Sequence, residues 1–162
     1  MKIGENGKWK WIFCLYVLII IRLIVFKYPY AELRAIMAGW RRDVVWEGLH
    51  SANFELFKTI KMYIHYYDRL NSFENLFGNI LIFIPYGMLY FMAFMKKWCR
   101  LLFLPFTFLF VTGIELFQLF SAFGKFDVDD ILLNCLGAAL GMIFMIAVTK
   151  IKWYAISRAE MR

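Results

Sequence analysis

Residues 131–148, ILLNCLGAALGMIFMIAV, form an apolar run in which Asn134 is the one charged or amide side chain. The preceding run, residues 101–123 (LLFLPFTFLFVTGIELFQLFSAF), carries only Glu115 and Gln118 in those two classes. Each run is close to the roughly 20 residues that an α-helix needs to cross about 30 Å of hydrocarbon. Helices and closed barrels satisfy the backbone hydrogen bonds in lipid. Both runs therefore predict membrane-spanning helices.

Two further apolar runs, residues 11–26 and 76–95, predict the same kind of helix, and the first of them is the shortest. Of the 162 residues, 62% are hydrophobic and 19% are charged, and the mean hydropathy is +0.60. This composition excludes a disordered chain and a small disulfide-rich secreted protein. The net charge of +7 comes from basic residues that flank the apolar runs, so we do not expect nucleic-acid binding. We expect an all-α polytopic membrane protein with four transmembrane helices in a single domain, residues 1–162.

Basic residues predict the orientation in the membrane. They gather before residue 11, at positions 96–100 and after residue 148, and short cytoplasmic segments carry such an excess. Both termini are therefore expected on the cytoplasmic side, and the long connection, residues 27–75, on the outer side. From Phe57 onward this connection repeats apolar residues at helical spacing. We expect an amphipathic helix there, lying in the outer membrane interface.

Five polar side chains interrupt the predicted spans, and such groups inside a membrane mark candidate sites. Consecutive spans run antiparallel, so the end of the first, the start of the second, the end of the third and the start of the fourth face one side. A rise of about 1.5 Å per residue places all five within roughly 12 Å of that side. We therefore predict a polar pocket that opens outward. Its side chains are Arg22, Asn79, Glu115, Gln118 and Asn134.

Three residues beside the spans continue the same helical faces. Asn75 precedes Asn79 by four positions, and Asp127, Asp130 and Asn134 follow one another at spacings of three and four. Such spacings place side chains on one face of a helix. We therefore include Asn75, Asp127 and Asp130 in the predicted binding set.

Two points stay open at this stage. Arg22 either pairs with Glu115, which relieves the desolvation cost of both charges, or extends its guanidinium to the outer headgroups. Asp127, Asp129 and Asp130 either line the pocket or cap the N-terminus of the fourth span, where negative charge is favoured. Capping accounts for one or two of the aspartates.

Small residues and a proline predict how the spans pack. Gly137 and Gly141 have the spacing that lets another helix approach the fourth span closely. Pro85 lies in the middle of the second span and leaves the carbonyl of Leu81 without a donor, so we expect a kink there, eased by Gly87.

Three motifs stand in order along the chain: NILIFIPYG at residues 79–87, ELFQ at residues 115–118 and DVDDILLNCLGAALG at residues 127–141. Together they resemble the VanZ-like family over about the last ninety residues, and Asn53 with Phe57 resembles a weaker upstream motif. The chain departs from the family pattern at Leu56, where proline is usual, and at Cys135, where threonine is common. Lys125 stands where arginine is frequent, which preserves the charge and changes its geometry.

The resemblance implies a bacterial cytoplasmic membrane protein that reduces susceptibility to teicoplanin, a lipid-bearing glycopeptide. Arg22 is not part of the family pattern, so its proposed pairing rests on the physical argument alone. By motif, the residues assigned to the site are Asn79, Glu115, Gln118, Asp127, Asp130 and Asn134.

Three functions remain as hypotheses. The first is a membrane factor that alters the outer cell surface, with membrane lipids and a lipid-linked cell-wall component as partners. The second is an enzyme acting on a lipid-linked substrate, with Glu115 as a buried base and Asp127 or Asp130 as its partner. A divalent cation is considered only under that hypothesis, and no cofactor is expected otherwise. The third is transport or flipping, and the oligomeric state stays open.

Overall fold

The computed structural model describes residues 5–66, 72–94 and 96–160. These residues are helical and include no β-strand, which confirms the predicted all-α class. Eight helices follow one another within them: α1 (Glu5–Ile24), α2 (Tyr30–Ala38), α3 (Arg42–Ser51), α4 (Lys58–His65), α5 (Ser72–Ala93), α6 (Lys97–Leu101), α7 (Phe103–Ser121) and α8 (Val128–Glu160).

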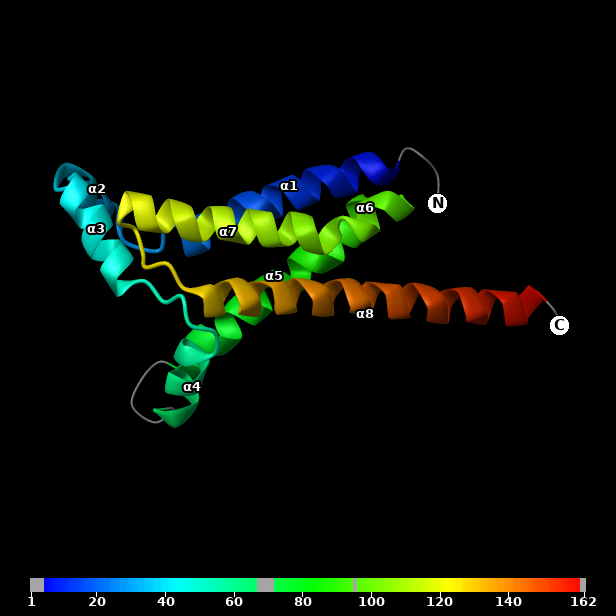
Figure 1. Cartoon of the computed structure of the whole chain (residues 1–162). Coiled ribbons are helices and arrows are strands. Elements are labelled where there is room, and N and C mark those ends of the chain that lie inside the picture. The colour runs from blue at the N-terminus through cyan, green and yellow to red at the C-terminus, as the bar shows by residue number, and fades with distance from the viewer. Residues whose placement is uncertain (1–4, 67–71, 95, 161–162) are drawn as a thin grey trace.

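The four long helices, α1, α5, α7 and α8, form the body of the molecule (Figure 1). The short helices α2, α3 and α4 gather at one end, where α7 ends and α8 begins. The start of α1, the helix α6 and the end of α8 lie toward the opposite end. The long connection and the basic turn near residue 96 therefore lie at opposite ends of the body, as antiparallel consecutive helices require.

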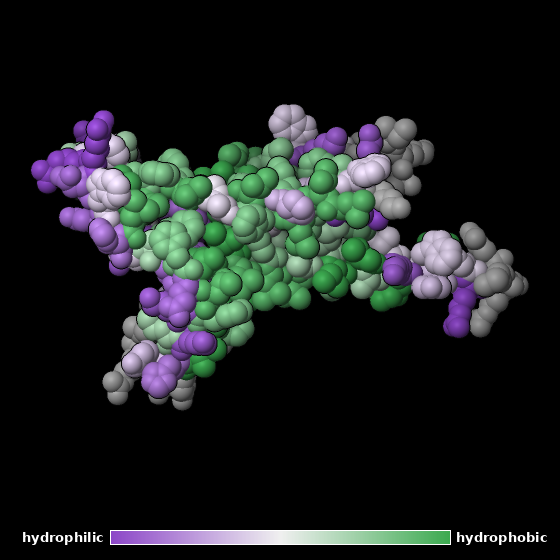
Figure 2. Space-filling view, in the orientation of Figure 1, coloured by the Kyte–Doolittle hydropathy of each residue, from purple (hydrophilic) through white to green (hydrophobic). Residues whose placement is uncertain are grey.

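Among the described residues, three helices are long and apolar enough to cross a membrane. The predicted first span corresponds to α1, which is not one of them, because Lys8, Lys10 and Arg22 lie within its apolar sequence. The space-filling view shows a broad apolar surface between two polar ends (Figure 2). The candidate spans are Asn75–Ala93, Phe103–Ser121 and Val128–Ala159.

The fourth predicted span differs in length from the prediction. The last helix continues to Glu160 instead of ending at residue 148, since nothing between these positions breaks a helix. At about 1.5 Å per residue, its 33 residues extend well beyond the body (Figure 1). Where an amphipathic helix is expected from Phe57 onward, the structure has the short α4, which has no buried residue; its place in a membrane interface stays a prediction.

Glycines bring α5 and α8 into backbone contact. A Cβ atom at Gly137 would lie 2.2 Å from the carbonyl oxygen of Ile80, and one at Gly141 would lie 1.9 Å from that of Ile84. This confirms the predicted close packing on the fourth span. Gly87 has a similar role, because a Cβ atom there would lie 2.0 Å from the carbonyl oxygen of Ala138.

Aromatic side chains from α1, α5 and α7 pack together in the middle of the body. Tyr86 and Phe83 are fully buried, and Tyr86 packs against Phe13 and stacks on Phe110 at a ring separation of 5.8 Å. Near Pro85, the hydroxyl of Tyr16 donates a 2.8 Å hydrogen bond to the carbonyl of Ile82. The carbonyl of Ile82 in α5, close to Pro85, thus has a hydrogen-bond donor from α1.

Candidate functional site

The long connection is joined to the start of α8 by a short parallel bridge between Asn53 and Asp127. The backbone N–H of Asn53 donates to the carbonyl of Phe126 at 2.9 Å, and the N–H of Val128 donates to the carbonyl of Asn53 at 3.0 Å. Backbone groups in this irregular region need such partners. The bridge fixes where the connection enters α4.

Asp127 reinforces this junction with its carboxylate. Its Oδ1 accepts hydrogen bonds from the amide of Asn53 and from the N–H of Asp129, both at 2.8 Å, and its Oδ2 accepts one from the hydroxyl of Thr59 at 2.5 Å. The bond to the N–H of Asp129 is an N-cap of α8. The capping hypothesis is therefore confirmed for Asp127.

Asp129 is fully buried and caps a different helix from the one expected. Its Oδ1 accepts a hydrogen bond from the N–H of Phe57 at 2.6 Å, and its Oδ2 accepts from Thr59 at 2.8 Å and Ile60 at 3.2 Å. Phe57 has a φ of 67°, which is unusual for a residue with a bulky side chain. Asp129 therefore secures the start of α4. We call Asn53, Thr59, Asp127 and Asp129 the loop anchor.

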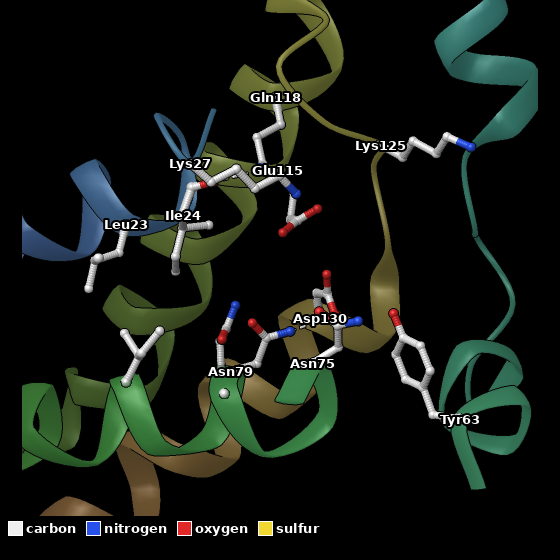
Figure 3. A pocket seen from close by; sticks show the side chains of 13 residues that line it. Leu23, Ile24, Lys27, Tyr63, Asn75, Asn79, Glu115, Gln118, Lys125 and Asp130 are labelled. Carbon is white, nitrogen blue, oxygen red and sulfur yellow. Dashed lines mark hydrogen bonds between the residues drawn. The ribbon is translucent and has the colours of Figure 1, made fainter. Parts of the chain in front are cut away.

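A cavity of about 280 Å³ lies between the ends of the long helices beside the loop anchor (Figure 3). Residues from α1, α4, α5, α7, α8 and the neighbouring connections line it. Most of them are polar: Lys27, Tyr63, Asn75, Asn79, Glu115, Gln118, Lys125, Asp130 and Asn134, with Leu23, Ile24, Gly78 and Ile82 as the remainder. The structure thus brings together seven of the eight predicted site residues around this cavity or its rim, counting Asp127 in the anchor.

Two carboxyl groups occupy opposite walls of the cavity. Glu115 is 1% exposed, and its Oε2 accepts a 3.1 Å hydrogen bond from the N–H of Asp127. Asp130 accepts a 2.7 Å hydrogen bond on Oδ1 from the amide of Asn79. Figure 3 shows both carboxyl groups directed into the space between the walls. Each has a second oxygen that no hydrogen bond from the described residues reaches.

The predicted amides differ in how they are satisfied. Gln118 donates to the carbonyl of Ile24 at 3.1 Å, so it joins α7 to the end of α1. Asn134 is 1% exposed, and its Oδ1 has no hydrogen-bond partner among the described residues. Asn75 lies at the edge of the cavity and is exposed. A buried acceptor without a donor costs free energy.

Arg22 lies away from the cavity, so of the two alternatives left open for it the pair with Glu115 is wrong. Its exposed guanidinium donates to the backbone carbonyl of Phe26. Ile20 is fully buried and Ile24 lines the cavity. Arg22 is two positions from each of them, and two residues turn a helix by about 200°. It therefore points to the other side of α1.

Three polar residues of the cavity lining were missed by the sequence reasoning about the site. Lys27 and Lys125 supply the positive charge that Arg22 was expected to supply. Tyr63 enters from α4, outside the predicted spans. Its pKa is raised above 10.0 because the phenol is partly buried and because the charges of Asp130 and Asp127 oppose its ionisation. Of these three residues, only Lys125 was indicated by the sequence, because it stands where the family pattern has a basic residue.

A wider hollow of about 560 Å³ adjoins the cavity on the side of the loop anchor. The two share Lys27, Tyr63, Lys125 and Asp130, so the cavity continues to the molecular surface beneath α4. Within the described ranges, no group of three His, Cys, Asp or Glu side chains is placed to hold a metal ion.

The fold and the site define a class of protein: an all-helical protein with a polar cavity at one end of its body and, in the part of the chain that the structure describes, three helices able to span a membrane. The family model of VanZ/LLP1 matches residues 13–149. The chain therefore belongs to this family and is a VanZ-like membrane protein, which confirms the resemblance of its motifs. Comparisons with curated proteins and with solved structures give no match.

Proposed function

We propose that the protein lies in the bacterial cytoplasmic membrane and lowers the binding of teicoplanin-type glycopeptides at the outer cell surface. In this proposal α1 is the fourth span, and the end of the body that carries α2, α3 and α4 faces outward. The basic residues near the start of α1, around α6 and near the end of α8 support that orientation, because cytoplasmic segments are enriched in lysine and arginine.

The cavity binds the polar part of a lipid or of a lipid-linked cell-wall component. The observation that carries this proposal is the pair of facing carboxyl groups of Glu115 and Asp130 among four amides and two lysines. Polar groups away from bulk water bind hydrogen-bonding ligands strongly, since the alternative is an unpaired buried group. Its volume of about 280 Å³ lies below the range of about 300–1,000 Å³ for drug-sized ligands. A headgroup or one sugar unit therefore fits better than a whole glycopeptide.

Binding of fluorescent teicoplanin and vancomycin to cells tests this function. Cells with the wild-type protein are compared with cells carrying Glu115→Gln or Asp130→Asn, at matched amounts of protein in the membrane. The matched control is Glu32→Gln, which changes an exposed glutamate of α2. We expect the wild type and the control to lower teicoplanin binding selectively and the two cavity variants to lose the effect. Equal teicoplanin binding in every strain would contradict the proposal.

A second candidate is an enzyme that acts on a lipid-linked envelope substrate. It is favoured by the position of Glu115, which is buried and has a free oxygen facing the cavity. A buried carboxyl group opposite a second one can divide acid and base roles with it. Purified protein incubated with a lipid-linked glycan, with and without Mg²⁺, would then release a product that Glu115→Gln does not release. Transport is less favoured, because aromatic side chains fill the middle of the body.

A further inference from the structure

Three oxygens around the cavity lack a donor from the described part of the chain, and two of them, the carboxylate oxygens, face its space. They are one carboxylate oxygen each of Glu115 and Asp130, and the Oδ1 of Asn134. Glu115 and Asn134 are each only 1% exposed, and leaving buried acceptors unpaired costs free energy. A ligand that fills the cavity should therefore supply several hydrogen-bond donors. Two carboxylates among the three acceptors favour donors that carry positive charge.

The remaining lining favours a ligand that also carries negative charge. Lys27 and Lys125 are exposed and line both the cavity and the adjoining hollow. Their formal charges balance those of Glu115 and Asp130. In Figure 3 the side chain of Lys125 extends away from the carboxyl groups, toward the outer rim. A zwitterion matches this layout, with its cation deep between the walls and its anion at the rim, and leaves the net charge of the site unchanged.

The cavity also has an apolar side, and Figure 3 shows its Leu23 and Ile24 across the carboxyl groups from Lys125. Leu23, Ile24 and Ile82 line it from α1 and α5. An apolar side suits a hydrocarbon part of the ligand. A metal ion fits less well, because it needs several ligands in one place and the described residues hold no such group.

We propose that the ligand carries a primary ammonium group joined to a phosphate by a short linker, as in an aminoethyl phospholipid headgroup. This inference rests on the proposed function and names the chemistry of the same cavity. The N–H groups of the ammonium donate to the free oxygens of Glu115 and Asp130. Lys27 binds the phosphate, and Lys125 reaches it from the rim on its flexible stem. A trimethylammonium group has no N–H and cannot satisfy these acceptors.

The test uses the purified full-length protein in detergent micelles. Phosphatidylethanolamine, its monomethyl and dimethyl derivatives, and phosphatidylcholine are titrated with identical acyl chains, and binding is followed by native mass spectrometry. Affinity should fall with each methyl group, by about tenfold or more over the whole series, because hydrogen bonds to charged groups are lost. Glu115→Gln and Asp130→Asn should reduce this preference to less than about twofold, while Glu32→Gln keeps it. Thermal unfolding without added lipid checks that each variant is folded.

Several outcomes would overturn the inference. One is equal affinity for the four lipids in the wild type, a result that does not depend on any variant folding. Another is loss of the preference when EDTA is present, which would assign the cavity to a metal ion. Lys27→Met should weaken binding of phosphatidylethanolamine and phosphatidylglycerol alike. An unchanged affinity for both lipids would show that Lys27 does not bind the phosphate. A second experiment adds soluble phosphoethanolamine to the protein with bound phosphatidylethanolamine. If it displaces the lipid, the protein recognises the headgroup alone. If it does not, the ligand is the whole membrane lipid.

The two proposals fail in different ways. If the variants lose the ammonium preference while teicoplanin binding to cells stays the same in all strains, the ligand is correct and the cellular function is wrong. If Glu115→Gln abolishes the teicoplanin effect while the four lipids bind equally, the function stands and the ligand class is wrong.

Discussion

Replacing Asp129 by asparagine should release α4 from the rest of the molecule. The carboxylate of Asp129 is buried and accepts three backbone hydrogen bonds, at 2.6, 2.8 and 3.2 Å. Each hydrogen bond to a charged group contributes about 1.5–3 kcal/mol. Asparagine keeps one acceptor oxygen and presents an NH₂ group to the donors that the other oxygen served. We therefore expect local opening of α4 to become about 3 kcal/mol easier.

Hydrogen exchange of the backbone amides measures this opening directly. A change of about 3 kcal/mol corresponds to roughly hundredfold faster exchange for the amides of Thr59 and Ile60, with the amides of α5 unchanged. The matched control is Asp43→Asn, which removes an exposed carboxylate from the first turn of α3. If the amides of α4 exchange equally fast in Asp129→Asn, the control and the wild type, the assigned role of Asp129 is wrong.

Three further predictions concern packing, backbone strain and ionisation. Gly141→Ala places a Cβ atom 1.9 Å from the carbonyl oxygen of Ile84 and should lower the free energy of unfolding by about 1–3 kcal/mol; Gly113→Ala, which meets open space, should not lower it. Phe57→Gly should be more stable than Phe57→Ala by about 1 kcal/mol in chemical unfolding, because the position has a left-handed φ of 67°, and equal stabilities would contradict this. The tyrosinate absorbance lost in Tyr63→Phe should titrate above pH 10.0. The raised pKa means that the folded state favours the neutral phenol of Tyr63. The stability that this phenol contributes is therefore present below pH 10.0 and lost at higher pH. A titration midpoint at or below 10.0 would argue against burial beside Asp130.

Part of the site was predictable because its residues interrupt apolar runs. Asn79, Glu115 and Asn134 stand out in spans where other side chains are apolar, and antiparallel helices bring them to the same end. Gly137 and Gly141 were predictable for a similar reason, since their spacing is a property of a single helix. For such residues, the position along a single helix is enough to predict how far the side chain lies from the end of the span and which face of the helix carries it.

Other parts depend on information that one helix does not contain. The rise per residue predicted the depth of Arg22, whereas its direction depends on how α1 is rotated against α5. The buried positions Ile20 and Ile24 show that rotation only once the packing is known. Periodicity also did not predict α2 and α3, which have no buried residue.

Tyr63 and the role of Asp129 were unpredictable for a further reason. Both depend on contacts between the long connection and the start of α8, which are about 70 positions apart, as in the hydrogen bond from Thr59 to Asp129, at a separation of 70. Asp129 lies among three aspartates with the same local chemistry. Only the path of the connection decides which of them caps α4, which caps α8 and which faces the cavity.

The bridge between Asn53 and Asp127, 74 positions apart, also has a consequence for the order in which the protein is made. The ribosome synthesises residues 53–60 well before it reaches α8, so this part of the nascent chain is without its partner while α5 and α7 are being inserted. Pairing over such a separation is slow compared with local contacts. The wall that carries Asp130 and Asn134 therefore joins last, and a chain halted before residue 127 holds Glu115 and Lys27 without a completed cavity.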